Sequence, residues 1–190
     1  SRNGARRERF EEELSILRPL PHTRLSASKR LEARVTKNST ILVQHNTYSV
    51  LSRLIGERVE VRTSVEHLEV WYSGQCVEKL PRLRGSKKFH IQYRHIIDWL
   101  VRKPGAFENY KFKEDLFPST TFRAAYDSLK MHGSSRADKE YLQILELAAK
   151  ESEDRVEEAL KLLLQKDEVP SRLRVRELMS CASNKATYEI

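Results

Sequence analysis

The sequence ERVEVRTSVEHLEVWYSGQ, residues 57–75, alternates between apolar and polar side chains in two consecutive segments. Val59 and Val61 occupy alternate positions in the first segment, and Leu68, Val70 and Tyr72 do so in the second. Because successive side chains of an extended chain point to opposite faces, this period predicts two strands, each with one buried and one solvated face. The stretch therefore indicates an antiparallel sheet that covers a core with one side.

The segments on either side of this stretch also have the composition of strands. STILVQHNTYSV at residues 39–50 and CVEKLPRLRG at residues 76–85 contain alternating or β-branched residues, and turn signals such as Ser73-Gly74 separate the segments. Four or five short strands are thus expected within residues 38–93. So many strands in so short a segment predict a small β-barrel.

After residue 93 the apolar residues recur at helical spacing. YRHIIDWLVRK, residues 93–103, has one apolar face, and Pro104-Gly105 ends it. Ser119 and the two threonines that follow it are expected to cap the next helix. Three later segments show the same spacing. The residues that we expect them to bury are Phe122, Ala125, Tyr126, Leu129, Tyr141, Leu142, Leu145, Ala148, Ala149, Val156, Ala159, Leu160 and Leu163. The predicted fold class is α+β, a small antiparallel β-barrel followed by an α-helical C-terminal region.

The charge of the chain is unevenly distributed along its length. Residues 1–104 contain 21 Lys and Arg against 11 Asp and Glu, whereas residues 105–190 contain 14 against 16. A strongly cationic first half and a nearly neutral second half indicate that the first half binds a polyanion.

The segment KLPRLRGSKKFHIQYRH, residues 79–95, contains six Lys or Arg and no acid. If its strands cover a core with one face, the cations gather on the other face and on the RGSKK loop. Like charges repel, so the segment gains stability only from a partner that supplies anions, and a nucleic-acid backbone does so. Phe89, His90 and Tyr93 lie between the cations and are suited to stacking or sugar contacts. A solvated basic face without a partner is the alternative.

Several classes of function are disfavoured by the absence of their motifs. The sequence has no phosphate-binding loop, no HExxH, no GxSxG and no dinucleotide fingerprint, and no pair of its six histidines is spaced for a metal. Cys76 and Cys181 lie far apart without metal or disulfide spacing, which favours a reducing cytoplasm. No apolar run reaches the roughly 18 residues of a membrane span, so no membrane contact is expected. The chain starts without Met, and we expect it to be part of a longer protein.

Four segments together resemble the region that follows the catalytic core in IstA-type transposases of bacterial insertion sequences. These segments are NTYSVLSRLIGERVEVR at 46–62, HLEVWYSGQCVEKLPRLRG at 67–85, YRHIIDWLVRKPGAF at 93–107 and LFPSTTFRAAYDSL at 116–129. The RKPGAF box and the basic strands before it are the most specific part of the resemblance. Transposases of this type are the larger of two encoded proteins, and the smaller is an IstB-type AAA+ helper ATPase.

The resemblance implies what the remainder of such a protein does. A DDE triad in an RNase H-like core binds two divalent metal ions, with Mg²⁺ expected, so the full-length protein is expected to be a metal-dependent enzyme. This chain resembles only the part beyond that core, and we expect it to contain neither catalytic residues nor a cofactor. Double-stranded DNA of the terminal inverted repeats, the IstB-type ATPase and a second copy in a homodimer are the expected partners, in the bacterial cytoplasm.

We predict five domains, and eight cations as DNA contacts. The domains are residues 1–27, the end of the catalytic domain and a linker; 28–93, the basic small β-barrel; 94–132, connecting helices; 133–168, a helical hairpin; and 169–190, a tail that docks on the body or is captured by a partner. The predicted contacts are Arg58, Arg62, Lys79, Arg82, Arg84, Lys87, Lys88 and Arg94, with Arg84 or Lys87 best placed to reach a groove edge. The alternative function is a protein-interaction module that bridges subunits without touching DNA.

Overall fold

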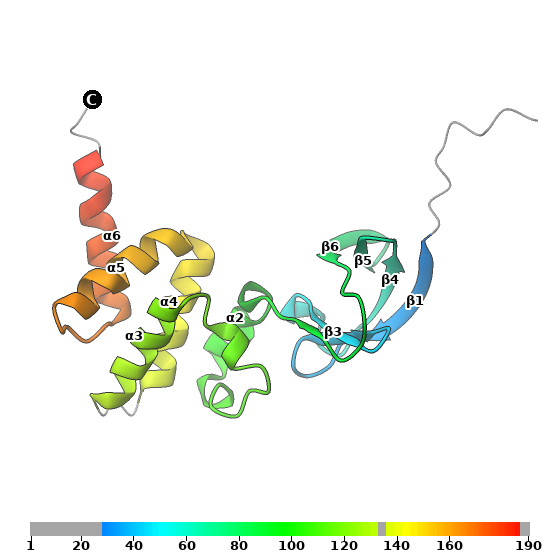
Figure 1. Cartoon of the computed structure of the whole chain (residues 1–190), viewed down its shortest axis with the longest axis horizontal. Coiled ribbons are helices and arrows are strands. Elements are labelled where there is room, and N and C mark those ends of the chain that lie inside the picture. Colours follow the sequence, from blue (N-terminus) through cyan, green and yellow to red (C-terminus); the bar gives the residue numbers. More distant parts are fainter. Residues whose placement is uncertain (1–27, 133–135, 187–190) are drawn as a thin grey trace, which may run out of the picture.

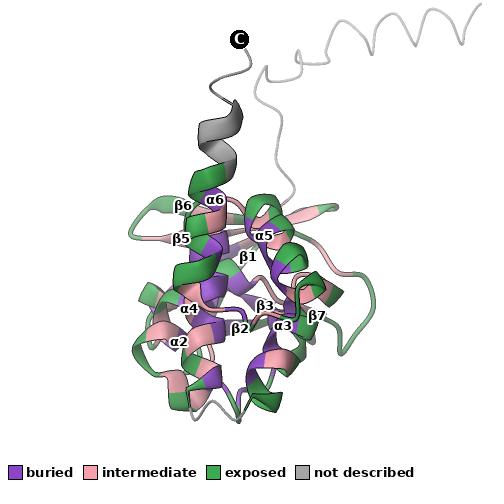
Figure 2. Cartoon of the chain, turned by 90° about the vertical axis from the view of Figure 1, so that its left-hand side faces the viewer, coloured by how far each residue is buried: buried purple, intermediate pink, exposed green. Residues whose placement is uncertain are grey.

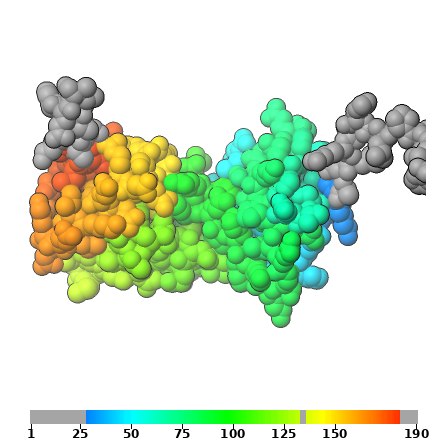
Figure 3. All heavy atoms as spheres, turned by 45° about the horizontal axis from the view of Figure 1, so that its top comes forward, coloured from blue at the N-terminus to red at the C-terminus, as the bar shows by residue number. Residues whose placement is uncertain are grey.

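The computed structural model describes residues 28–132 and 136–186, with side chains described as far as residue 181. The strands lie at one end of the molecule and most of the helices at the other, with α2 (Tyr93–Arg102) between them (Figure 1). The space-filling view shows the same two parts, joined along the chain (Figure 3). The predicted segment 1–27 lies outside the described residues.

Four strands form the larger sheet in the order β1-β4-β5-β6. They are β1 (Lys29–Arg34), β4 (Arg58–Thr63), β5 (His67–Tyr72) and β6 (Gln75–Pro81). All neighbouring pairs are antiparallel, and β4 and β5 are the two strands of the quoted stretch. Val59, Val61, Leu68 and Val70 are buried and confirm the predicted inward face, whereas Tyr72 is only partly buried and packs against the same core.

A second, smaller sheet has the order β2-β3-β7. It consists of β2 (Thr40–Val43), β3 (Asn46–Ser49) and β7 (Phe89–His90), and η1 (Ser52–Leu54) follows β3. β2 and β3 form an antiparallel hairpin, but β7 joins β3 in parallel. The parallel pair departs from the predicted all-antiparallel arrangement, because the chain reaches β7 through a loop from the other sheet and not through a hairpin.

The predicted closed barrel is not confirmed, because the described strands form two separate sheets over one core. The outer strands β1 and β6 of the larger sheet are not paired with each other. β6 ends at Pro81, whose nitrogen cannot donate to a further ladder. The shared core contains Val35, Ile41, Val43, Tyr48, Val50, Leu54, Val59, Val61, Leu68, Val70 and Leu80. The inward side chains of both sheets therefore act as one hydrophobic unit.

Five α-helices lie within the described residues. They are α2, α3 (Thr120–Met131), α4 (Ala137–Lys150), α5 (Glu153–Gln165) and α6 (Arg172–Ala186), and the short turns η2 (Pro104–Ala106) and η3 (Glu114–Leu116) connect α2 to α3. None of the described helices is long and apolar enough to cross a membrane. The chain thus combines largely antiparallel sheets with a helical region that follows them.

The helices share a second hydrophobic core, and Figure 2 shows its buried positions along their inner faces. The helical residues expected to be buried are buried except Val101 and Ala149, which pack partly exposed against the same core. Val175 and Met179 of α6 are buried as well, so the described part of the tail docks on the body. Helical periodicity located this core correctly because each helix buries one stripe.

Ser119 occupies the predicted capping position, but its side chain does not make the predicted capping hydrogen bond. Ser119 precedes α3, yet its hydroxyl makes no cap bond. It donates to Oε1 of Glu157 on α5 at 3.0 Å, and Thr121 donates to the same oxygen at 3.0 Å. Packing between α3 and α5 brings this carboxylate within reach, and a charged acceptor binds a hydroxyl more strongly than backbone groups do. The predicted helix end at Gly133 lies outside the described residues.

His95 of α2 connects the helix to both sheets. It is 5% exposed, and its Nδ1 lies 3.0 Å from the carbonyl oxygen and 2.9 Å from the hydroxyl of Ser49 on β3. Its Nε2 lies 3.2 Å from Oε2 of Glu78 on β6. A protonated Nδ1 would donate to the Ser49 carbonyl and a protonated Nε2 would donate to the Glu78 carboxylate, so the tautomer of the neutral ring decides which of these two acceptors it bonds. The backbone N–H of Gln92 also donates to the Ser49 hydroxyl at 2.8 Å, which fixes the start of α2.

Burial is the main influence on the pKa of His95. It lowers the pKa below the ordinary value, the carboxylate of Glu78 and the carbonyl of Ser49 raise it in part, and His90 lowers it further. Burial also lowers the pKa of His90, with Glu78 again acting in the opposite direction. Both histidines therefore bind protons more weakly in the folded chain than in the unfolded one.

We expect acid to destabilise the fold through these two histidines. The unfolded chain takes up protons first as the pH falls below about 6.5, so the unfolding free energy should decrease between about pH 7 and pH 5. His95→Gln should flatten this profile and should cost about 1–3 kcal/mol at pH 7, because the groups around the ring lose their partner. Urea unfolding of both chains at several pH values measures the effect. His132→Gln, at an exposed histidine, is the control, and an equally flat profile for it would contradict the assignment to His95.

Candidate nucleic-acid interface

The candidate site centres on the basic loop, defined as residues 82–88, which leads from β6 to β7. Arg84, Lys87 and Lys88 are exposed on it, and none of the three makes an ion pair with any described residue. Gly85 has φ of 89° and Lys87 has φ of 60°, so the backbone turns twice through the left-handed region within four residues. Three cations are thus presented on one tight turn with no acid to neutralise them.

A buried asparagine holds the backbone of this loop in place. Asn46 of β3 is 2% exposed, and its amide donates to the carbonyl oxygens of Leu83 at 3.2 Å and Gly85 at 2.8 Å. Its side-chain oxygen accepts from the N–H of Lys88 at 3.0 Å. Three backbone groups of the loop are satisfied by one side chain, so the loop has a fixed shape although its surface is solvated.

Further hydrogen bonds continue this attachment along the β2–β3 hairpin. The hydroxyl of buried Tyr48 accepts from the N–H of Leu83 at 2.9 Å. The N–H of Lys87 donates to the carbonyl of His45 at 2.9 Å, and the N–H of Thr47 donates to the carbonyl of Lys88 at 2.9 Å. The loop therefore enters the smaller sheet as β7. The smaller sheet positions the basic residues, so the exposed cations of the loop stand on a backbone that is already ordered.

Arg82 begins the basic loop but serves a different purpose from the cations after it. Its guanidinium donates to the carbonyl oxygen of Ser64 at 2.8 Å and to the side-chain oxygen of Gln44 at 3.1 Å. It thereby ties the loop to the β4–β5 turn and the β2–β3 turn. A hollow lined by Gln44, Val65, Arg82, Leu83, Arg84 and Gly85 lies beside it. Arg82, which we predicted to contact DNA, thus uses its guanidinium mainly to fix the position of the loop.

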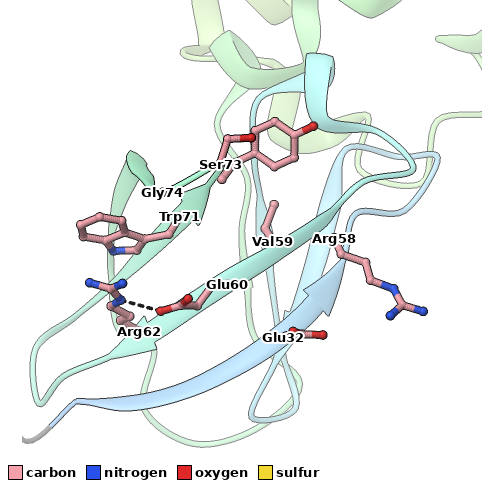
Figure 4. Close-up of a pocket in the computed structure, with 9 residues that line it drawn as sticks. Glu32, Arg58, Val59, Glu60, Arg62, Trp71, Ser73 and Gly74 are labelled. Atoms are coloured by element: carbon pink, nitrogen blue, oxygen red, sulfur yellow. Dashed lines mark hydrogen bonds and ion pairs between the residues drawn. The ribbon is translucent and has the colours of Figure 1, made fainter.

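The solvated face of the larger sheet is of mixed charge. Arg62 donates from Nε to Oε1 of Glu60 at 2.6 Å, and its guanidinium lies 3.7 Å from the ring centroid of Trp71 (Figure 4). The pair lowers the pKa of Glu60, with the hydrogen bond from Arg62 as its largest cause. The indole N–H of Trp71 donates to Glu69 at 3.0 Å. Arg62 therefore already has an anion and an aromatic partner.

Arg58 and Lys79 lie elsewhere on the larger sheet and are exposed. Arg58 points away from the Arg62–Glu60 pair in Figure 4, and it lies opposite Arg34 of β1 in the sheet register. Lys79 lies opposite Glu69 of β5. Each of these cations is therefore accessible, but the acids on the same face dilute the local positive potential.

Arg94 is taken up by the contact between α2 and α5. Its guanidinium lies 3.0 Å from Oε2 of Glu153, and the hydroxyl of Tyr93 donates to the same oxygen at 2.7 Å. Burial and the Glu153 carboxylate raise the pKa of Tyr93 well above the ordinary value. The eight predicted contacts thus divide into exposed cations without an ion pair among the described residues and cations with structural partners. The first group contains Arg58, Lys79, Arg84, Lys87 and Lys88, and the second contains Arg62, Arg82 and Arg94.

The sequence analysis missed Lys111, which lies beside the aromatic residue that follows the basic loop. Lys111 is exposed, and its Nζ lies 5.9 Å from the ring centroid of Phe89 and 5.2 Å from that of Phe112. The sequence YKFK at residues 110–113 alternates aromatic and basic residues, and this was the available signal. Its position beside Phe89 depends on the fold, because the two residues are separated by α2.

The described residues do not fit the divalent metal ions that the resemblance implies for the full-length protein. No three His, Cys, Asp or Glu side chains in the described ranges come together as a metal site. We therefore derive no metal-dependent step for this chain.

Two comparisons with known proteins match this chain. Residues 20–92 match the family model described as Mu transposase, C-terminal domain. The strands of both described sheets, from β1 to β7, lie within this range. A protein of Sinorhizobium fredii (strain NBRC 101917 / NGR234), described as uncharacterized protein y4jA/y4nE/y4sE, is 33% identical over 132 residues, which cover 67% of this chain and 26% of that protein. The chain thus spans about a quarter of the length of this relative. No solved structure matches. The family match supports a C-terminal region of a transposase.

We expect Asn46→Ala to release the basic loop. The change leaves two carbonyl oxygens and one N–H without their partner, so the unfolding free energy should fall by about 1–3 kcal/mol. Urea unfolding measures this loss, and hydrogen exchange should show faster exchange at Lys88. Asn38→Ala is the matched control, since the Asn38 side chain makes no hydrogen bond within the described part of the chain. An equal loss in both variants would show that Asn46 does not hold the loop.

Proposed function

We propose that this chain is the non-catalytic, C-terminal portion of an IstA-type DDE transposase, and that it binds the double-stranded DNA of the transposon ends through its basic loop. The single observation that carries the proposal is the loop itself, where Arg84, Lys87 and Lys88 stand exposed, without acid partners in the described structure, on a backbone held by Asn46. Cations held in this way suit the regularly spaced phosphates of a duplex.

The geometry gives the other predicted contacts different parts in this function. Arg58 of β4 and Lys79 of the edge strand β6 are exposed and would extend the contact along the duplex. Arg62, Arg82 and Arg94 already have partners, so they would act indirectly by supporting the surface. Phosphate contacts position a protein on DNA without reading its sequence. We therefore assign this chain to gripping the ends and supporting synaptic complex assembly, and not to sequence recognition.

The basic loop makes a quantitative prediction for duplex binding. Changing Arg84, Lys87 and Lys88 together to Ala should weaken binding and should reduce the slope of log K against log salt by about 2 to 3, at about 0.9 per phosphate contact. Fluorescence anisotropy with a labelled duplex across a salt series measures both quantities. The matched control is Lys139→Ala, Lys166→Ala and Arg176→Ala, three exposed cations of the helical region, which removes the same charge elsewhere.

The outcome separates the proposal from the protein-interaction module. Equal losses in the two triple variants would mean that only net charge matters and would remove the basic loop from the interface. No duplex binding by the unaltered chain would favour a module whose basic face meets an acidic protein. The observation that favours the protein-interaction module is the mixed charge of the larger sheet, where Glu60 and Glu69 lie beside the cations.

The rest of the proposed function rests on the resemblance and concerns the whole protein. The complete transposase would act as a homodimer, cut and join DNA at a separate core with Mg²⁺, and recruit an IstB-type AAA+ ATPase. For the ATPase contact we propose the surface around Leu173 on α6, which is 68% exposed. Hollows on both sides of it are lined by Glu140, Gln143, Ser171, Arg172, Arg176, Glu177, Ser180 and Cys181. An exposed apolar side chain within a polar rim is typical of a protein contact.

This contact should be tested by a point change, because removal of the tail would also remove packing. α6 buries Val175 and Met179 against the helical core, so a deletion of residues 169–190 would destabilise that core as well. Leu173→Glu should reduce co-purification of the ATPase about tenfold or more while it leaves duplex binding and thermal stability unchanged. Met131→Glu, at an apolar residue that is 85% exposed on α3, is the control. Undiminished co-purification with Leu173→Glu would exclude this surface.

A further inference from the structure

On the outer face of the smaller sheet, the packing of the described residues leaves two large apolar side chains, Leu42 and Phe89, exposed on either side of Thr47. Leu42 of β2 lies opposite Thr47 of β3, and Thr47 lies opposite Phe89 of β7, so the three side chains stand side by side across the sheet. Leu42 is 64% exposed and Phe89 is 52% exposed. The inward neighbours Ile41 and Tyr48 are buried, so the exposed row is the solvent side of the sheet.

Phe89 is held rigidly despite its exposure. Its ring lies 5.3 Å from that of Phe112, centroid to centroid, with a tilt of 54° between the planes. Phe112 is itself only 6% exposed and belongs to the helical core. The backbone on either side is fixed by the Asn46 contact to Lys88 and by the pairing of β7 with β3. One part of the ring is therefore supported from behind while another part faces solvent.

The charge around this ring favours a nucleic acid as its occupant. Lys87 and Lys88 directly precede Phe89, Lys111 lies against its ring, and none of these lysines has an ion pair in the described structure. An apolar protein partner would have to desolvate these cations without compensation, whereas a nucleic acid offers both a flat base and phosphates. A supported aromatic ring beside phosphate-binding cations is the arrangement by which single-stranded nucleic acid is bound.

We propose that Phe89 stacks on an unpaired or unstacked base of DNA whose neighbouring duplex lies on the basic loop. In the interior of an intact duplex each base is stacked on both sides, so no interior base face is available to the ring. The ring therefore gives the chain a preference for DNA that is frayed, nicked or single-stranded next to a duplex. This inference rests on the proposed DNA binding by the basic loop, and it adds which DNA structure the same surface prefers.

The test compares two DNA molecules and three variants of the whole chain. One DNA is a fully paired duplex, and the other is the same duplex with a short single-stranded tail. The variants are Phe89→Ala, Phe89→Leu, which keeps the packing on Phe112, and Met131→Ala as an exposed apolar control. The unaltered chain and Met131→Ala should bind the tailed DNA more tightly. Phe89→Ala should bind the tailed DNA about tenfold more weakly than the unaltered chain and bind the paired duplex as before.

The possible results separate this inference from the proposed function. Failure of the unaltered chain to bind either DNA would overturn the duplex binding on which the inference rests. Normal duplex binding without a preference for the tail, or an unchanged preference in Phe89→Ala, would overturn the stacking alone. Phe89→Leu keeps the proposal testable if the alanine variant unfolds, because it should lose most of the preference and remain folded. An equal loss on both DNAs would place Phe89 against the DNA backbone and so contradict base stacking.

A second measurement reports the contact directly. With 5-iodouracil in the tail, irradiation should crosslink the DNA to Phe89, and mass spectrometry of the crosslinked peptide identifies the residue. With 5-iodouracil only inside the paired duplex, the crosslink to Phe89 should be absent. A crosslink to other residues alone would contradict the proposed position of the base.

Discussion

The buried contact of His95 with Ser49 and Glu78 is the constraint on which the arrangement of this molecule depends. The imidazole ring comes from a helix, the serine from the smaller sheet and the glutamate from the larger sheet, so one side chain connects three parts of the chain. Burial keeps the ring a weak base while both of its nitrogens face acceptors. The position of α2 on the sheets, and with it the path to the helical core, follows from this contact.

The same principle separates positive charge that holds the fold from positive charge that can bind a partner. Arg62 forms an ion pair with Glu60 and lies over the ring of Trp71, and Arg94 forms an ion pair with Glu153. These two cations therefore already have partners within the molecule. The basic loop differs, because its shape is held mainly by an uncharged side chain. Asn46, an uncharged residue, fixes the backbone, and the cations Arg84, Lys87 and Lys88 are exposed to solvent. A ligand that binds them meets a surface that is already shaped, so little conformational entropy is lost on binding.

The proposed grip on DNA ends fits this division between structural and exposed cations. The sheets present the loop, and Phe89 and Lys111 extend its surface toward the helical region. The helices bury their own core and expose Leu173 at the far end of the described chain. DNA on one part and a protein partner on the other would then lie at opposite ends of the molecule, since α2 stands between the two parts (Figure 1).

The sequence by itself determined the elements whose pattern is local. Alternation placed Val59, Val61, Leu68 and Val70 inward, and helical spacing located the second core, because burial of one face leaves a period in the sequence. The basic stretch was likewise visible as composition. Only the tertiary structure decided that the strands form two sheets with a parallel β3–β7 pair, and that Asn46 holds the loop. It alone brought Arg62 to Trp71, Arg94 to Glu153 and Lys111 to Phe89, because these contacts join residues that no local period relates.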